Sequence, residues 1–121
     1  MNIKRLEHEL SVCKLRDFSS VDPSLPFHFT ARTDEEYSLV CPTANVPEET
    51  LAREDGWRGF RIEGVLDFSL IGILARISGL LAESGISIFA LSTYNTDYIL
   101  VKSENYERAL QILTAVGYTI L

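Results

Sequence analysis

The segment that most constrains the fold is a mostly apolar stretch, residues 64–102, which reads GVLDFSLIGILARISGLLAESGISIFALSTYNTDYILVK. Aliphatic side chains recur in it at the three-and-four spacing of one helical face. These are Leu70, Ile73, Leu74, Ile77, Leu80 and Leu81. Burying six such side chains stabilises a fold by roughly 1.5–3 kcal/mol each, before chain entropy is subtracted. The pattern predicts a helix over residues 68–84 that docks on a sheet, with Asp67 or Ser69 as its cap and Gly85 at its end.

The opposite face of this helix carries small residues, namely Gly72, Ala75, Gly79 and Ala82. Each glycine inside a helix costs about 1 kcal/mol relative to alanine, and an ordinary solvated face carries long polar side chains instead. A smooth stripe lets a second backbone approach closely. We therefore expect this helix to be covered on two sides, by its own sheet and by a neighbouring unit. The alternative is that this face is exposed to solvent and that its small residues arose by neutral sequence drift.

The amino-acid composition and net charge exclude several classes of protein. Hydrophobic residues make up 46% of the chain and charged residues 23%, as in a soluble globular domain. The net charge of −6 argues against nucleic acid or an anionic membrane as the main partner. The apolar window 65–82 is no membrane span, because Asp67 and Arg76 lie inside it. No segment reads as a signal peptide, so we expect a cytoplasmic protein.

Metal chemistry has little support in the sequence. Cys13 and Cys41 occur singly in apolar runs, which suits buried reduced thiols, and only His8 and His28 accompany them. No spacing typical of metal ligands appears. We expect neither a metal nor a cofactor.

Composition changes near position 55, since all four prolines precede it and all seven glycines follow it. We expect two structural units, residues 1–55 and 56–121. The first is strand-rich, with a strand over 8–16 and a hairpin of strands 27–31 and 37–41. The second reads as strand 57–63, helix 68–84, strands 86–93 and 97–102, a helix capped by Ser103, and strand 118–121. This βαββαβ order predicts an α+β, ferredoxin-like fold.

The residues 64–102 quoted above resemble the ACT domain family, and STYNTDYILVK is the most specific part of the match. The likeness is strongest over residues 57–118 and is closest to small tandem-ACT proteins similar to the cytosolic arginine sensors. The fragment TDEEYSLVCP resembles a degenerate first ACT-like unit. The resemblance implies a regulatory module that binds an amino acid or another small metabolite at an interface between paired units and performs no chemistry itself.

The residues themselves offer a candidate seat for such a ligand. Free N–H groups at the start of the 68–84 helix suit a carboxylate, Asp67 can accept an amine, and Phe68 can form a wall. Polar side chains of the 92–97 turn can add contacts, and the resemblance adds residues 86–88. The candidate site is Val65, Leu66, Asp67, Phe68, Ser69, Ile86, Ser87, Ile88, Ser92, Thr93, Asn95 and Asp97. The plainer interpretations make Asp67 a helix cap and Asp97 a residue that closes a turn.

Three functions are open on this reading. The favoured one is a stand-alone regulatory domain, homodimeric and acting on another protein in trans. The second is a ligand-free assembly module. The third, a small acylphosphatase-like hydrolase, is disfavoured because residues 64–68 contain no cation and no Ser-His-Asp grouping appears.

Overall fold

The computed structural model describes residues 1–63 and 72–121, and the chain divides into two compact units. One unit combines Met1–Glu7 with Arg58–Leu121, and the other is His8–Trp57. The predicted first unit was residues 1–55. In the structure, the first seven residues belong to the unit formed by the second half of the chain. The 8–57 unit is therefore an insertion into a unit that is discontinuous in sequence. Below, the larger unit is called the helical unit and the smaller one the strand unit.

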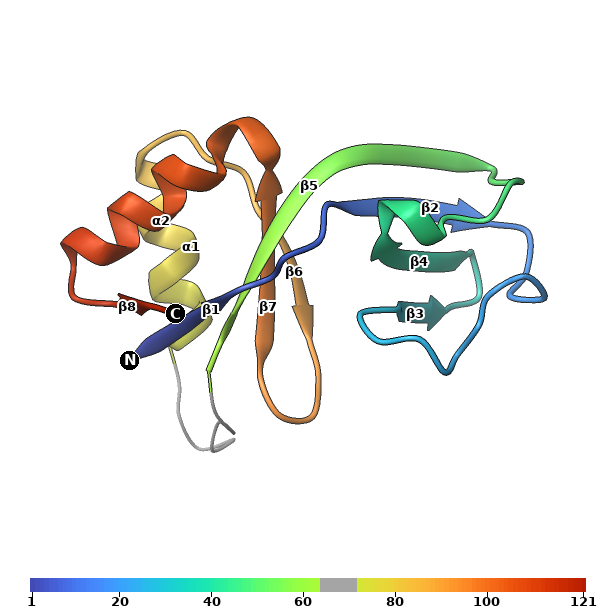
Figure 1. The fold of residues 1–121 in the computed structure, drawn as a ribbon, viewed down its shortest axis with the longest axis horizontal. Helices are drawn as coiled ribbons and strands as arrows, with labels where there is room; N and C mark the ends of the chain where they lie inside the picture. Colours follow the sequence, from blue (N-terminus) through green and yellow to red (C-terminus); the bar gives the residue numbers. More distant parts are fainter. Residues whose placement is uncertain (64–71) are drawn as a thin grey trace. The chain divides into compact units, whose positions relative to one another are not determined.

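In its described residues, the helical unit contains five strands and two α-helices (Figure 1). Its elements are β1 (Asn2–Arg5), the last part of β5 (Ala52–Ile62), α1 (Ile73–Glu83), β6 (Phe89–Ser92), β7 (Asp97–Lys102), the 3-10 turn η2 (Ser103–Asn105), α2 (Tyr106–Ala115) and β8 (Thr119–Ile120). From β5 onward this is the predicted βαββαβ order, so the ferredoxin-like α+β fold is confirmed. The strands lie in the order β8-β1-β5-β7-β6.

Strand β1 was not predicted, and it separates the first and last strands of the βαββαβ unit. Ile3 lies opposite Ile62 in the antiparallel pairing with β5 and opposite Ile120 in the parallel pairing with β8. Ile3 is fully buried, while the other three residues of β1 are exposed. A strand with one buried side chain has too little alternation to be predicted from its sequence.

The core of the helical unit lies between the sheet and the two helices. The sheet contributes Ile3, Phe60, Ile62, Ile99 and Val101, and the helices contribute Ile77, Leu81, Tyr106, Ala109, Leu110 and Leu113. Ile73, Leu74 and Leu80 pack against this cluster, partly buried. The predicted aliphatic face of the first helix is thus confirmed for every member that the structure describes.

Helix α1 begins at Ile73, and Gly72 precedes it with a φ of 83°. Residues 64–71, including the predicted caps Asp67 and Ser69, lie outside the described residues. The other end matches the prediction, because Gly85 has a φ of 76°. The Ile86 amide donates to the Leu81 carbonyl at 2.9 Å, which closes the helix end.

The small-residue face of α1 is exposed in a single copy of the chain. Gly72, Ala75, Gly79 and Ala82 are all solvent-exposed. A Cβ atom built on Gly79 meets no atom within 4 Å among the described residues. Within the described residues no atom lies against Gly79 on this face, so its expected covering by a neighbouring unit stays a prediction.

Helix α2 starts later than predicted. Ser103 opens the 3-10 turn η2 and makes no side-chain cap hydrogen bond, and the α-helix proper begins at Tyr106. The buried Tyr106 hydroxyl donates to the Gly59 carbonyl at 2.7 Å, and the Arg58 guanidinium lies 4.6 Å from the centre of its ring. Burial raises the pKa of the Tyr106 hydroxyl. This contact joins the start of α2 to strand β5.

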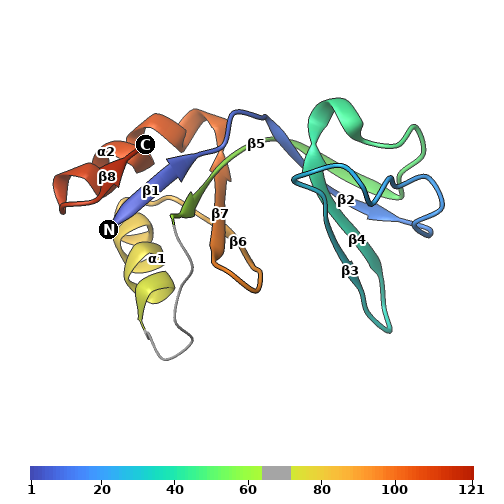
Figure 2. The same ribbon diagram turned by 60° about the horizontal axis from the view of Figure 1, so that its bottom comes forward.

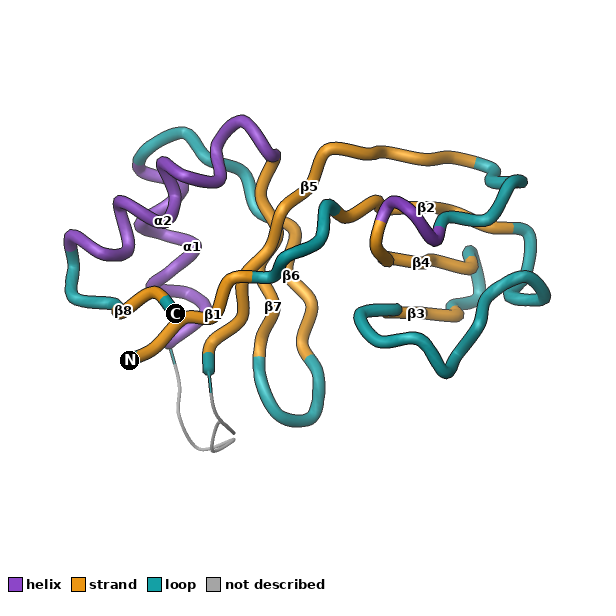
Figure 3. The backbone as a smooth tube through the Cα atoms, in the orientation of Figure 1, coloured by secondary structure: helices purple, strands orange, loops and turns teal. Residues whose placement is uncertain are grey.

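The strand unit is an antiparallel sheet of β2 (Leu10–Leu15), β3 (Phe29–Arg32), β4 (Tyr37–Pro42) and the first part of β5, in the order β3-β4-β2-β5. The predicted hairpin is confirmed by the pairing of β3 with β4. Residues 8–57 form no α-helix, only the 3-10 turn η1 (Thr43–Asn45; Figure 3). Its core includes Cys13, Leu15, Leu39 and Cys41.

Candidate functional site

The turn between β6 and β7 carries four polar residues of the predicted site, all of them among the described residues. Ser92 lies opposite Asp97, and the Ser92 hydroxyl donates to an Asp97 carboxylate oxygen at 2.7 Å. The Thr93 amide donates to the Thr96 carbonyl at 2.9 Å, which closes the turn. Asn95 is exposed. Asp97 therefore does close the turn, while its second carboxylate oxygen stays available for another donor.

A buried hydrogen bond fixes this turn to the neighbouring strand. The Thr96 hydroxyl donates to the Ile62 carbonyl at 2.7 Å, at the end of β5 from which the chain continues toward α1. The turn and the first turn of α1 lie at the same end of the helical unit in both Figure 1 and Figure 2. Ser92, Thr93, Asn95 and Asp97 are thus gathered at the sheet end where β5 finishes.

The other predicted site residues are not part of this group. Val65, Leu66, Asp67, Phe68 and Ser69 lie outside the described residues. Residues 86–88 follow the far end of α1, a helix roughly 16 Å long. There Ile86 is a buried core residue, Ser87 is exposed and Ile88 packs partly against the core. Within one chain, therefore, Ile86, Ser87 and Ile88 are remote from the turn.

A charged cluster supports β5 beside the hairpin. The Arg61 guanidinium lies 3.3 Å from a Glu63 carboxylate oxygen and 3.3 Å from the Tyr98 hydroxyl. The hydrogen bond to Tyr98 and the one to Glu63 raise the pKa of Arg61 further above its already high ordinary value. Arg61 is therefore a permanent cation already matched by a carboxylate, which leaves it little capacity for an anionic ligand.

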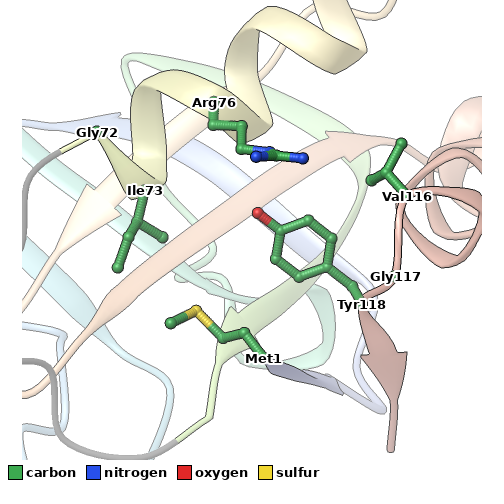
Figure 4. Close-up of a pocket in the computed structure, with 7 residues that line it drawn as sticks. All are labelled: Met1, Gly72, Ile73, Arg76, Val116, Gly117 and Tyr118. Carbon is green, nitrogen blue, oxygen red and sulfur yellow. The ribbon is translucent and has the colours of Figure 1, made fainter.

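Sequence reasoning missed a hollow on the side of the helical unit, between α1 and the connection from α2 to β8 (Figure 4). Its volume is about 360 Å³. The side chains that line it are Met1, Ile73, Arg76, Val116 and Tyr118, with Gly72 and Gly117 contributing backbone. The signal available in the sequence was Arg76, a lone cation on a helical face of small residues.

The strand unit has a more polar hollow of about 660 Å³ between residues 15–20 and 48–51. The Arg16 guanidinium on its rim lies 3.6 Å from a Glu49 carboxylate oxygen, and both side chains are largely exposed. An exposed pair of this kind contributes about 0–1 kcal/mol. The same hollow is also lined by Asp17 and Glu48, which give it an excess of negative charge.

In residues 1–63 and 72–121, no group of three His, Cys, Asp or Glu side chains is placed to hold a metal ion. Within the same ranges, neither α-helix has the length and apolarity that crossing a bilayer demands.

The family model described as an ACT domain matches residues 52–115 of this chain. The cytosolic arginine sensor for mTORC1, subunit 1, of Homo sapiens is 31% identical over 103 residues. That match covers 78% of this chain but only 31% of the human protein, so the chain spans about a third of the length of this relative.

Solved structures show the same fold. A protein from Agrobacterium tumefaciens is 29% identical with a TM-score of 0.84, covering 99% of this chain and 91% of that one. The regulatory subunit of aspartate kinase from Thermus thermophilus gives a TM-score of 0.68 at 10% identity, covering 95% and 96% of the two chains. At that identity the second likeness concerns the fold alone.

Proposed function

This chain belongs to the ACT domain family, and we propose that it is a non-catalytic, cytoplasmic regulatory domain that binds a small metabolite, foremost an amino acid. The ligand sits at an interface between ACT-like units supplied by two copies of the chain. The bound dimer then acts on another protein in trans. A relative described as a cytosolic arginine sensor supports this proposal.

The observation that carries the proposal is the fixed polar turn at the end of β5. Its Ser92 hydroxyl and Asp97 carboxylate are hydrogen-bonded at 2.7 Å, and Thr96 ties the turn to Ile62. A carboxylate held in place before binding accepts a ligand ammonium group with little loss of conformational freedom. The turn lies at the end of the helical unit where α1 begins. A zwitterion site shared between the turn and the segment before α1 requires this placement.

A second copy is needed to complete the site. Residues 86–88 of one chain are at the wrong end of α1 to reach its own turn, so any role of Ser87 in binding requires the neighbour's residues. The exposed face of Gly72, Ala75, Gly79 and Ala82 supplies a surface on which two helices can approach closely.

A thermal-shift panel of the twenty amino acids tests the proposal. A ligand that binds only the folded protein stabilises it by about 2.7 kcal/mol at a concentration one hundred times its Kd. We expect one amino acid, or a few of related chemistry, to raise the unfolding midpoint, with arginine among the first to be measured. A flat response across the panel from a stable dimer overturns amino-acid binding and favours the assembly module.

A further inference from the structure

We propose a second small-molecule site in the hollow beside α1, where Arg76 and Tyr118 bind a monocarboxylate that carries a short apolar body. The hollow shares no residue with the β6–β7 turn and meets the small-residue face of α1 only at Gly72, so the inference goes beyond the proposed amino-acid site. Its volume of about 360 Å³ lies in the range of roughly 300–1,000 Å³ found for ligand pockets.

The charged end of the ligand would meet two donors. Arg76 extends from α1, and Tyr118 precedes β8 with its hydroxyl directed into the same hollow (Figure 4). Neither side chain makes a hydrogen bond or an ion pair with another described residue. Guanidinium groups bind carboxylates through two parallel hydrogen bonds, and a phenol hydroxyl adds a third donor.

Three other arginines of the helical unit have a partner within the described residues. Arg61 lies against Glu63, Arg58 stacks on Tyr106, and Arg108 donates to the Ser84 carbonyl. The chain carries 17 acidic and 11 basic residues, so an intramolecular carboxylate partner for a cation is readily available. Arg76 has no acidic partner among residues 1–63 and 72–121 and its side chain borders the hollow, where it can meet an external anion.

The walls of the hollow suit an apolar body. Ile73 and Tyr118 pack against the core of the helical unit, which fixes their positions. Met1 is 54% exposed and Val116 is 40% exposed, so both present apolar surface that a ligand would remove from water. In Figure 4 the Tyr118 ring lies among Ile73, Met1 and Val116, with its hydroxyl directed toward the Arg76 guanidinium.

A monoanion matches this site better than a phosphate. One guanidinium balances one negative charge, whereas a net charge of −6 on the chain opposes the approach of a dianion. The apolar walls also disfavour the strongly hydrated phosphate group, because its unpaired oxygens would lose water without gaining partners.

Titration of the 15N-labelled full chain with hexanoate, followed by amide NMR, tests the site. We expect saturable shifts at Arg76, Gly117 and Tyr118, and none with the neutral isostere hexanamide or with inorganic phosphate at equal concentration. Loss of a hydrogen bond to a charged group weakens binding roughly tenfold or more, so Arg76→Gln should raise the Kd by at least that factor. Tyr118→Phe should raise it severalfold.

Lys4→Gln is the matched control, because it removes an exposed cation of the same unit outside the hollow. It should bind hexanoate like the parent. Unshifted amides, a Kd unchanged in Arg76→Gln that retains the parent's spectral dispersion, or equal binding of phosphate would overturn the site. None of these results bears on the amino-acid panel, whose response depends on the turn, so the two proposals fail separately.

Discussion

The Thr96 hydroxyl is buried and donates a 2.7 Å hydrogen bond to the Ile62 carbonyl oxygen, which joins the β6–β7 turn to the end of β5. Replacing Thr96 with Val keeps the shape of the side chain but leaves that carbonyl without its donor. We expect Thr96→Val to lower the free energy of unfolding by about 1–3 kcal/mol, measured by urea denaturation. Thr119→Val, at an exposed position on β8, should change it by less than about 0.5 kcal/mol.

Asp97 offers the sharpest test of the amino-acid site. Asp97→Asn preserves a hydrogen-bond acceptor for Ser92 but removes the negative charge that an ammonium group would contact. The variant should keep its unfolding midpoint and lose the stabilisation that the parent gains from its amino-acid ligand. A full ligand-induced shift in Asp97→Asn would restrict this residue to closing the turn. Ser92→Ala separates the two effects, because it removes the turn hydrogen bond and keeps the charge.

Gly79 tests whether the small-residue face of α1 forms the dimer contact. Gly79 has no positive φ and open space around it, so Leu fits there within one chain, whereas Gly72 with its φ of 83° would be strained by any side chain. Gly79→Leu should raise the dimer dissociation constant at least tenfold in sedimentation experiments. Its thermal midpoint should match or exceed the parent's at low protein concentration, because Leu favours a helix by several tenths of a kcal/mol relative to Gly. Unchanged assembly would exclude this face as the contact.

Tyr106 anchors the start of α2 through its hydroxyl and Gly59. Tyr106→Phe retains the ring on which Arg58 stacks and deletes only the buried hydrogen bond. The expected loss is about 1–2 kcal/mol in the free energy of unfolding, measured by denaturation. Tyr37→Phe is the matched control, since the contacts of Tyr37 with Phe18 and Arg32 are made by its ring and persist without the hydroxyl. Equal effects of the two changes would contradict the anchoring role.

The two cysteines predict a pH dependence on the alkaline side. Burial raises the pKa of the Cys41 thiol from its ordinary 9.0 to about 11 and also raises that of Cys13. The unfolded chain therefore loses these protons first, and stability should fall as the pH rises from about 9 toward 11. Thermal midpoints across this window measure the effect, and Cys41→Ala should flatten it. Iodoacetamide should also label the native protein far more slowly than the urea-denatured chain.

Local patterns account for what could be predicted from the sequence. The three-and-four spacing around Ile77 identified the first helix, and the STYNTDY segment identified the hairpin. Each of these patterns is formed by residues that are close together in the sequence. Strand β1 was missed because its placement depends on partners far along the sequence, in β5 and β8. The first part of β5 was missed because Arg53, Glu54 and Asp55 are charged and exposed although they belong to a strand.

The site was predictable only where it is local. Ser92 and Asp97 are neighbours across a tight turn, so their proximity follows from the hairpin alone. Arg76 and Tyr118 line the same hollow because α1 and α2 pack on the same core, and no spacing in the sequence encodes that. Ile86, Ser87 and Ile88 can contact a ligand at the turn only if they come from a second molecule, and the sequence of one chain does not encode how two molecules pack.

The position of β1 between β5 and β8 also constrains the order in which the strands can pair during folding. Closing this sheet joins residues from the two extremes of the sequence, which is the slowest and entropically most expensive kind of contact to form. The inserted unit of residues 8–57 reduces that expense, because its own antiparallel pairing of Leu10 with Trp57 draws the flanking segments together. During synthesis, the helical unit would have to await the emergence of β8 before its sheet could be completed, and until then β1 would present an unpaired edge.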